Sequence, residues 1–230
     1  MNAPFQRRGK SHIAWTMLLR RPLALAAAAF ALAPAACAGP EADSPVAEAT
    51  ATAAVTDSAW TLDPTASRLG YVSIKAGEVA ENNRFDAISG SVAADGTASL
   101  DIDLASVNTG VDIRNERMRE IFFGVAENPK ATITATLDPA RFVGLAVGQS
   151  VTRPVKAEVT IKGIAAEVEA EVLVTRTAED RVMVVTVAPL IISTDMFGLT
   201  DELGELRALA QLPSITPAVP VTFTLTFKRG

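Results

Sequence analysis

The stretch that decides the fold is residues 155–174, which read VKAEVTIKGIAAEVEAEVLV. Apolar and polar residues alternate from Val155 to Ile161 and again from Ala166 to Val174, and Lys162-Gly163-Ile164 lies between the two runs. Strict alternation is typical of a strand with one apolar and one wet face, and a short glycine-containing turn can reverse an antiparallel pair. The stretch therefore predicts a β-hairpin.

The same alternation recurs along most of the chain. Further strands are expected over residues 67–75, 84–92, 98–104, 132–137, 181–188 and 219–227. Asp95-Gly96 marks a second hairpin turn, and residues 181–188 are apolar on both faces, which suggests packing against a helix or a second copy of the chain. About eight antiparallel strands without a strand–helix–strand rhythm predict a mainly β fold, either a closed barrel or a sandwich.

Two segments have helical rather than strand spacing of their apolar residues. The first covers residues 112–123, with Asp112 as the expected N-cap and Gly124 as the expected stop. The second covers residues 201–212 and is ended by Pro213. Both segments are expected to form short helices that pack on or over the strands.

Two clusters of aromatic and charged residues leave a structural and a functional interpretation open. In the first helical segment, Phe122 and Phe123 lie near Arg114. This segment is either an amphipathic helix with a charged wet face, or a lid whose aromatic residues face a cavity with Arg114 beside a polar or anionic head group. Residues 194–198 are either a β-bulge with Phe197 in the core or a second part of such a cavity.

The first 37 residues have the pattern of an export leader. Five Lys and Arg residues precede or flank an apolar run over residues 23–33, small residues follow, and no acidic residue is present. The run has about 11 residues, fewer than the roughly 20 that a membrane-spanning helix needs.

Cys37, the only cysteine, follows this apolar run in a context that resembles a lipobox. We expect a lipoprotein anchored through Cys37 to a bacterial membrane and facing the periplasm; cleavage by ordinary signal peptidase after Ala35 or Ala38 is the alternative. Residues 38–59 are rich in Ala, Thr and acidic residues and are expected to form a disordered linker. The folded domain is expected over residues 60–230.

Composition argues against several classes of function. All 26 acidic residues but only 16 of the 21 basic residues follow position 37, so that part of the chain has a net charge of −10. This charge disfavours binding to nucleic acid or to anionic membrane surfaces. The single histidine, His12, lies in the leader, and chemistry based on histidine, cysteine or zinc therefore lacks its residues beyond Cys37. We expect no enzyme, no metal and no cofactor.

Five motifs in one order carry a family resemblance. They are WTLDPTAS at 60–67, LASVNTG at 104–110, RNERM with IFF at 114–123, VTIKGI at 159–164 and DMFGL at 195–199. Together they resemble the YceI-like, polyisoprenoid-binding family of exported bacterial proteins. Asn115 stands where the family has Asp, and Lys162 where His is frequent.

The resemblance implies an extended, eight-stranded, lipocalin-like antiparallel barrel with one or two short helices. It also implies an interior that holds an apolar isoprenoid-type lipid, a polyprenyl lipid or a quinone, as a periplasmic carrier or store. The alternative is a non-catalytic scaffold barrel at the cell envelope without bound lipid. The resemblance assigns Arg114, Phe122, Phe123, Asp195 and Phe197 to the ligand pocket. The strand pattern adds three aromatic residues expected to face the interior, Tyr71, Phe85 and Phe223. Expected partners are the lipid, a membrane tether through Cys37, and a second copy of the chain through residues 181–188.

Overall fold

A computed structural model describes residues 59–138, 142 and 144–230. The predicted leader, Cys37 and almost all of the predicted linker lie outside the described residues. The strands are β1 (Trp60–Leu62), β2 (Arg68–Lys75), β3 (Val79–Phe85), β4 (Ile88–Val92), β5 (Thr97–Asp103), β6 (Val107–Asn108), β7 (Lys130–Thr136), β8 (Ser150–Ile161), β9 (Ile164–Ala178), β10 (Arg181–Thr186), β11 (Leu190–Ser193) and β12 (Ala218–Arg229). The helical elements are η1 (Pro64–Ala66), η2 (Leu104–Ser106), α1 (Asp112–Arg117), η3 (Met118–Phe122), η5 (Thr194–Phe197) and α2 (Thr200–Leu209).

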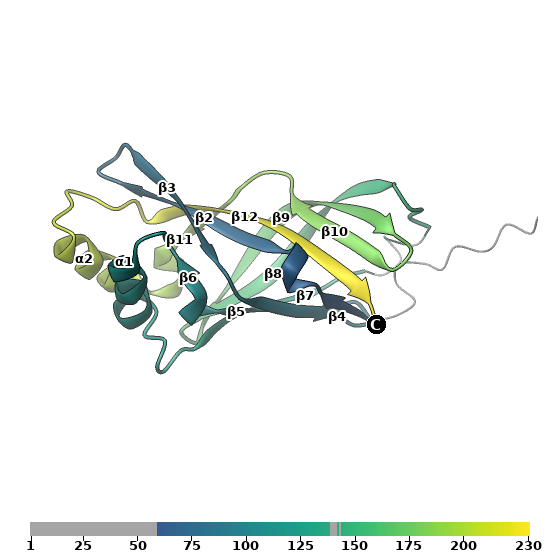
Figure 1. Cartoon of the computed structure of the whole chain (residues 1–230), viewed down its shortest axis with the longest axis horizontal. Helices are drawn as coiled ribbons and strands as arrows, with labels where there is room; N and C mark the ends of the chain where they lie inside the picture. The colour runs from purple at the N-terminus through teal and green to yellow at the C-terminus, as the bar shows by residue number, and fades with distance from the viewer. Residues whose placement is uncertain (1–58, 139–141, 143) are drawn as a thin grey trace, which may run out of the picture. The chain divides into compact units, whose positions relative to one another are not determined.

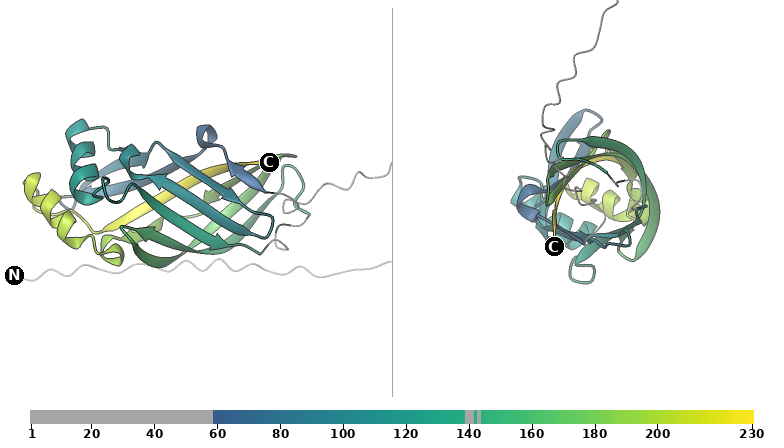
Figure 2. Two further views of the ribbon diagram at one scale, coloured as in Figure 1. Left: turned by 90° about the horizontal axis from the view of Figure 1, so that it is seen from below. Right: turned by 90° about the vertical axis from the view of Figure 1, so that its right-hand side faces the viewer.

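The strands close into an antiparallel barrel. The order is β1-β4-β5-β7-β8-β9-β10-β12, and β12 pairs with β1 to complete the ring. Seen along its axis, the domain is a closed ring of strands (Figure 2). After closure, each of these eight strands pairs with a neighbour on both sides over at least part of its length. A barrel avoids edge-to-edge association in this way. The predicted eight-stranded antiparallel barrel with short helices is confirmed.

The remaining strands continue barrel strands after a break. β2 follows β1 and pairs with the same edge of β12. β3 pairs with β2 and leads into β4. β11 follows β10 and pairs with the other edge of β12. Short interruptions such as η1 and η2 separate the two halves of each strand. The β2–β3 hairpin extends the barrel wall toward α1 and α2, which lie together at one end of the domain (Figure 1).

The hairpin predicted from residues 155–174 is confirmed in its register. β8 and β9 pair along their length, from Ser150 opposite Thr175 to Ile161 opposite Ile164. The two turn residues, Lys162 and Gly163, have φ values of 50° and 76°. Two left-handed residues in a row define the tight turn whose twist matches the flanking strands.

Several predicted boundaries are wrong. The strand expected over residues 84–92 begins earlier, at Val79, and is interrupted between Phe85 and Ile88. Its polar first half hides the alternation. Asp112 is the first helical residue rather than the N-cap, because Val111 occupies that position with extended backbone and no side-chain hydrogen bond. The second helix ends at Leu209, three residues before the expected end, and Gln211 then adopts a φ of 52°.

Asn115 has a clear structural role at the start of α1. Its Oδ1 accepts hydrogen bonds from the backbone N–H and the hydroxyl of Thr109, both at 2.7 Å. The segment ends as the sequence predicts, since Gly124 has a φ of 56° that suits glycine. Between these points the helix widens into a π-turn, in which the Phe123 N–H donates to the carbonyl of Met118.

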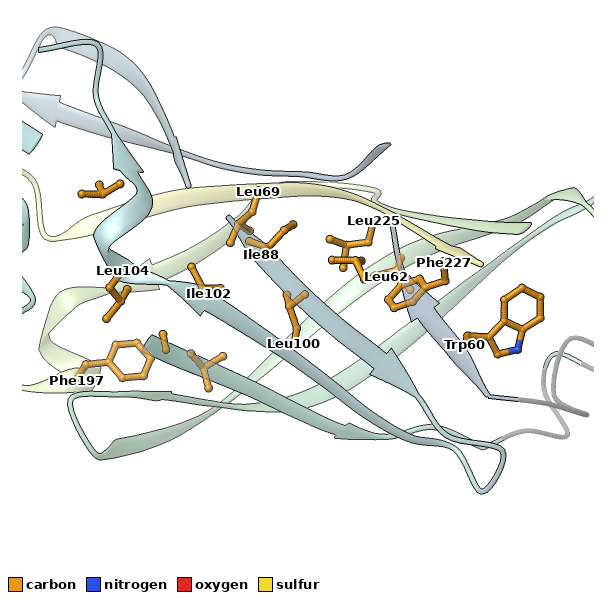
Figure 3. Close-up of a cluster of buried hydrophobic side chains, with 14 of the residues drawn as sticks. Trp60, Leu62, Leu69, Ile88, Leu100, Ile102, Leu104, Phe197, Leu225 and Phe227 are labelled. Carbon is orange, nitrogen blue, oxygen red and sulfur yellow. The ribbon is translucent and has the colours of Figure 1, made fainter. Parts of the chain in front are cut away.

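The buried core lies inside the barrel. Side chains from facing strands point inward, including Trp60, Leu100, Ile102 and Phe227, and Leu104 of η2 joins them (Figure 3). The strand residues come from the apolar positions of the alternating strands, so the two-residue period directly sets which side chains fill the interior. β10 contributes Val182 to this core and has β9 and β12 on its two edges. A homodimer through residues 181–188 stays a prediction.

The break between β1 and β2 is fixed by side chains of the first motif. Asp63 caps η1 by accepting from the Thr65 N–H at 3.1 Å, and its carboxylate pairs with Lys228 at 2.6 Å. The Ser67 hydroxyl donates to the carbonyl of Asp63 at 2.7 Å and accepts from the N–H of Thr226 at 2.9 Å. One buried hydroxyl therefore satisfies a backbone group of β12 and one of the residue after β1, where the ladder is interrupted.

We expect Ser67→Ala to destabilise the domain by about 1–3 kcal/mol, because it leaves the buried N–H of Thr226 without its acceptor. The measurement is chemical denaturation followed by circular dichroism. Ser91→Ala is the matched control, since Ser91 is exposed and its hydroxyl forms a long hydrogen bond of 3.4 Å with the Ser99 hydroxyl. Equal loss of stability in both variants would contradict this role of Ser67.

Candidate functional site

A cavity of about 720 Å³ occupies the barrel interior. It extends from Trp60 at one end to residues of α1 and α2 at the other. The inward positions of β8 and β9 illustrate its wall: Val155, Ala157, Val159, Ile161, Val168, Ala170, Val172 and Val174 all line it. These are apolar members of the alternating pattern in residues 155–174, so one sequence feature builds both the fold and the cavity.

Many of the inward apolar side chains are only partly buried. Ala157, Val168, Ala170 and Val184 fall in this class although they face the inside of a closed barrel. The exposed surface of these side chains therefore faces the cavity. The protein's own side chains leave this space unfilled, and its wall attracts water poorly.

One end of the cavity lies at Trp60, where the exposed residues Ala93 and Ala94 also belong to its lining. Trp60 is 4% exposed, lines the cavity, and has the guanidinium of Arg229 at 5.2 Å from its ring centroid. Arg176 is 2% exposed and donates to the carbonyls of Leu145 at 3.1 Å and Glu179 at 2.9 Å. These bonds hold the segment before β8 against the β9–β10 turn. We call this end of the cavity the base.

The opposite end, which we call the mouth, reaches the surface. Val111 and Ile113 both line the cavity and are 43% and 53% exposed. Ala210, just after α2, also lines the cavity and is exposed. The mouth therefore lies where α1, the end of α2 and the β2–β3 hairpin meet, at the helical end of the domain (Figure 1).

Polar side chains gather at the mouth. Glu81 on β3 accepts from the Lys75 ammonium at 2.9 Å through one oxygen and pairs with the Arg114 guanidinium through the other. Arg114 also donates to the hydroxyl and the carbonyl of Thr109, both at 3.0 Å. These bonds fix the start of α1 to the β2–β3 hairpin. Next to them, the Asn83 amide donates to the Ser73 hydroxyl at 3.0 Å.

Two of the mouth's ionisable groups have shifted pKa values. Burial alone would raise the pKa of Glu81, but the hydrogen bond from Lys75 and the charges of Arg114 and Lys75 outweigh it and lower the pKa below its ordinary value. Burial raises the pKa of Tyr71 well above its ordinary range, against a smaller opposing effect of Arg114. Glu81 is therefore charged at neutral pH, and Tyr71 keeps its hydroxyl proton.

Seven of the eight residues predicted for the ligand pocket line the cavity. They are Tyr71, Phe85, Arg114, Phe122, Phe123, Phe197 and Phe223. Four of them form a continuous aromatic series, in which ring centroids lie 5.7 Å apart for Tyr71 and Phe85, 5.9 Å for Phe85 and Phe123, and 5.0 Å for Phe122 and Phe123. α1 exposes Asp112 and Glu116 and also contributes Arg114 to the cavity lining, and the lid interpretation stays a prediction.

Asp195 is the eighth predicted residue, and the structure places it outside the cavity lining. It is exposed, and its carboxylate accepts from the Thr200 hydroxyl at 2.6 Å, at the first residue of α2. Its neighbour Phe197 is 1% exposed and faces the interior (Figure 3). The cluster thus combines a core aromatic residue with a helix-start carboxylate. Lys162 likewise lies outside the lining, where its ammonium pairs with Glu202 and connects the β8–β9 turn to α2.

Sequence reasoning missed the polar lining of the mouth. Ser73 and Lys75 on β2, Glu81 and Asn83 on β3, and Arg117 on α1 all line the cavity. In a strand over residues 67–75 with Tyr71 facing inward, the two-residue period places Ser73 and Lys75 on the inward face as well. Their polarity argued against that side being the interior.

The cavity lining is mostly apolar, and its four charged residues lie at the mouth. The described residues include no group of three or more His, Cys, Asp and Glu residues placed to hold a metal ion. Within the same ranges, no helix is long and apolar enough to cross a membrane. The arrangement chemically suits a slender amphiphile with a long apolar part inside the barrel and a polar part at the mouth.

Comparison with known proteins identifies relatives. The family model for the YceI-like domain matches residues 60–227. The structure of a polyisoprenoid binding domain from Saccharophagus degradans, implicated in plant cell wall breakdown, is 40% identical with a TM-score of 0.73, and the match covers 75% of this chain and 99% of that chain. BcnA from Burkholderia cenocepacia is 23% identical with a TM-score of 0.55 over 72% of this chain and 98% of that chain, which shows a shared fold. A search of curated proteins finds no match.

Proposed function

Because this chain belongs to the family of YceI-like domains, we propose that it binds the tail of an isoprenoid-type lipid, a polyprenyl lipid or a quinone, inside its barrel. The observation that carries this proposal is the apolar cavity of about 720 Å³ between Trp60 and the mouth. Its volume falls in the range of roughly 300–1,000 Å³ that is usual for ligand pockets. An eight-stranded barrel is wide enough for one slender ligand.

The energetics favour a long apolar tail. Each buried methylene contributes roughly 0.8 kcal/mol, so ten buried carbons contribute on the order of 8 kcal/mol, which corresponds to a micromolar Kd. The hydrogen bonds of the barrel already hold the residues of the cavity wall in place. Binding therefore loses little conformational entropy of the protein. The polyisoprenoid binding domain from Saccharophagus degradans, 40% identical to this chain, supports the same ligand class.

The proposed role is a non-catalytic carrier or store. The sequence pattern of residues 1–37 supports export to the periplasm, and the lipobox-like context of Cys37 supports a membrane tether. A tethered barrel joined to its anchor by the linker over residues 38–59 would stay close to the bilayer that supplies its lipid. Asp195 is not included among the proposed ligand contacts, and Trp60 is added at the base.

Native mass spectrometry of the purified protein, followed by organic extraction and mass analysis of the extract, tests this proposal. We expect a bound species with the mass of an isoprenoid compound, present at one copy per chain. A protein that is empty on purification is then mixed with a polyprenyl alcohol and with a quinone. Failure to take up either one would reject lipid binding and leave the scaffold interpretation.

A further inference from the structure

Large apolar side chains are exposed around the mouth of the cavity. Val79 begins β3 at the tip of the β2–β3 hairpin, Val111 and Ile113 lie at the start of α1, and Leu209 ends α2. Between 43% and 53% of the surface of each is exposed. We call these four residues the rim. The three elements that carry them lie together at the helical end of the domain (Figure 1).

A hydrogen bond and an ion pair connect the three elements of the rim. The N–H of Ala76, in the hairpin turn, donates to the carbonyl of Ser214 at 2.9 Å, in the segment that follows α2. The Arg114 guanidinium pairs with Glu81 and connects α1 to β3. Because these elements already hold one another in place, their exposed side chains can enter an apolar phase with little loss of protein conformational entropy.

The rim continues the apolar lining of the cavity onto the surface. Val111 and Ile113 belong to the lining and are also exposed. The exposed lining residues near the base are smaller: Ser91, Ala93, Ala94 and Ser99. Among the described lining residues, the large exposed apolar ones therefore lie at the mouth.

The charges beside the rim disfavour an anionic surface. Glu78 precedes Val79 and Asp112 lies within the α1 part of the rim, and both carboxylates are exposed. Arg207, two positions before the end of α2, is exposed as well. The part of the chain after position 37 has a large net negative charge, and an anionic bilayer would repel it. A zwitterionic bilayer carries no such penalty.

The tether proposed through Cys37 allows the mouth to reach a membrane. Residues 38–59 lead into Trp60, at the end of the cavity opposite the mouth. A linker of this length spans at most about 75 Å when extended, whereas the 12 residues of β12 rise about 40 Å. A chain anchored at Cys37 can therefore turn its mouth toward the membrane that holds the anchor.

We propose that the rim docks the domain on a zwitterionic lipid bilayer, so that the ligand's tail passes between bilayer and barrel without crossing water. This inference rests on the proposed lipid-binding function and names the membrane as the partner of the same site. Each methylene of an isoprenoid tail opposes passage through water. Exposed apolar side chains around an entrance can enter the interfacial region of a bilayer and bring the opening to the acyl chains.

The test uses the chain from Ala49 to Gly230. These residues form a compact unit with the whole closed barrel and its core, so they fold without the preceding segment. The unit has neither the apolar run of the leader nor Cys37, which could bind vesicles by themselves. Flotation measures its binding to phosphatidylcholine vesicles. Stopped-flow fluorescence measures transfer of a labelled polyprenol from those vesicles, and a separate titration measures affinity for the same polyprenol added from ethanol.

The decisive double variant is Val79→Gln with Leu209→Gln, because these two rim residues do not line the cavity. We expect vesicle binding about ten-fold weaker and transfer about ten-fold slower, with affinity for polyprenol from ethanol unchanged. The matched control is Val147→Gln with Ile191→Gln, which removes two apolar side chains that are at least as exposed but lie outside the rim. The control should bind vesicles as the wild type does, and circular dichroism melts confirm folding of both.

The outcomes separate this inference from the function on which it rests. A chain that binds the polyprenol but no vesicle would overturn membrane docking and leave lipid binding intact. Equal weakening in both double variants, or binding to anionic vesicles alone, would overturn docking of the rim on a zwitterionic bilayer. A wild-type dimer in sedimentation that the rim variant lacks would assign the rim to a second copy instead. Failure to bind the polyprenol from either source would reject lipid binding itself.

Discussion

Replacing Ala170 with tryptophan is expected to weaken binding of a long-chain lipid roughly a hundred-fold while the barrel still folds. Ala170 lies on the inner face of β9, between Val168 and Val172 and opposite Val155. An indole at this position projects into the hollow and occupies the path of the tail. Losing room for four methylenes costs about 3 kcal/mol, or roughly a hundred-fold in affinity. The variant should fold because the side chain enters space that no other side chain fills.

Titration with a fluorescent or mass-labelled polyprenyl lipid measures this effect. Glu169→Trp is the control, because it adds the same side chain to the exposed outer face of the same strand. We expect the control to bind as the wild type does. If Ala170→Trp were folded and bound the lipid with unchanged affinity, the tail could not lie inside the barrel.

The largest expected effect on stability is that of Arg176→Met. Arg176 is 2% exposed and donates to the carbonyls of Leu145, Ala178 and Glu179. Hydrogen bonds from a charged group contribute about 1.5–3 kcal/mol each, and the carbonyls left behind lose a donor that water cannot easily replace. We expect a loss of about 3–5 kcal/mol. For a domain of this size, that lowers the Tm by about 10 °C.

Thermal denaturation compares this variant with Arg207→Met, which removes an exposed arginine from α2. The control should melt within a degree or two of the wild type. Similar Tm values for the two variants would show that the base does not depend on the buried guanidinium.

The sequence predicts most of the barrel wall well, because the inward residues of strands such as β8 and β9 are apolar and most of their outward residues are polar. Residues 155–174 fix a hairpin, its turn and eight cavity-lining side chains in one pattern. The aromatic members of the pocket are also accessible to sequence reasoning, since Phe122 and Phe123 follow a family motif and Tyr71 and Phe223 occupy alternating strand positions. The closed ring itself depends on pairing β1 with β12, across almost the whole domain, and only the family resemblance predicts it.

The mouth is predicted poorly, because the usual rule is inverted there. On β2 the inward residues at the helical end are Ser73 and Lys75, while Val72 and Ile74 lie outside the cavity lining. The usual rule assigns the apolar face of a strand to the interior, and it therefore places Ser73 and Lys75 wrongly on the outer face. The Glu81 interactions with Lys75 and Arg114 join three elements, so no local pattern reveals them. Asp195 illustrates the opposite error, since a family motif residue forms a helix-start contact instead of lining the cavity.

Fluorescence quenching of Trp60 tests the central claim most directly. In a Trp15→Phe variant, Trp60 is the only tryptophan of the chain, and it lines the base of the cavity. The protein is titrated with a polyprenyl lipid that carries bromine at the end of its tail, and with one that carries bromine beside its head. We predict saturable quenching at one lipid per chain by the first and much weaker quenching by the second. Binding of the tail-brominated lipid without any quenching of Trp60 would contradict a tail held inside the barrel.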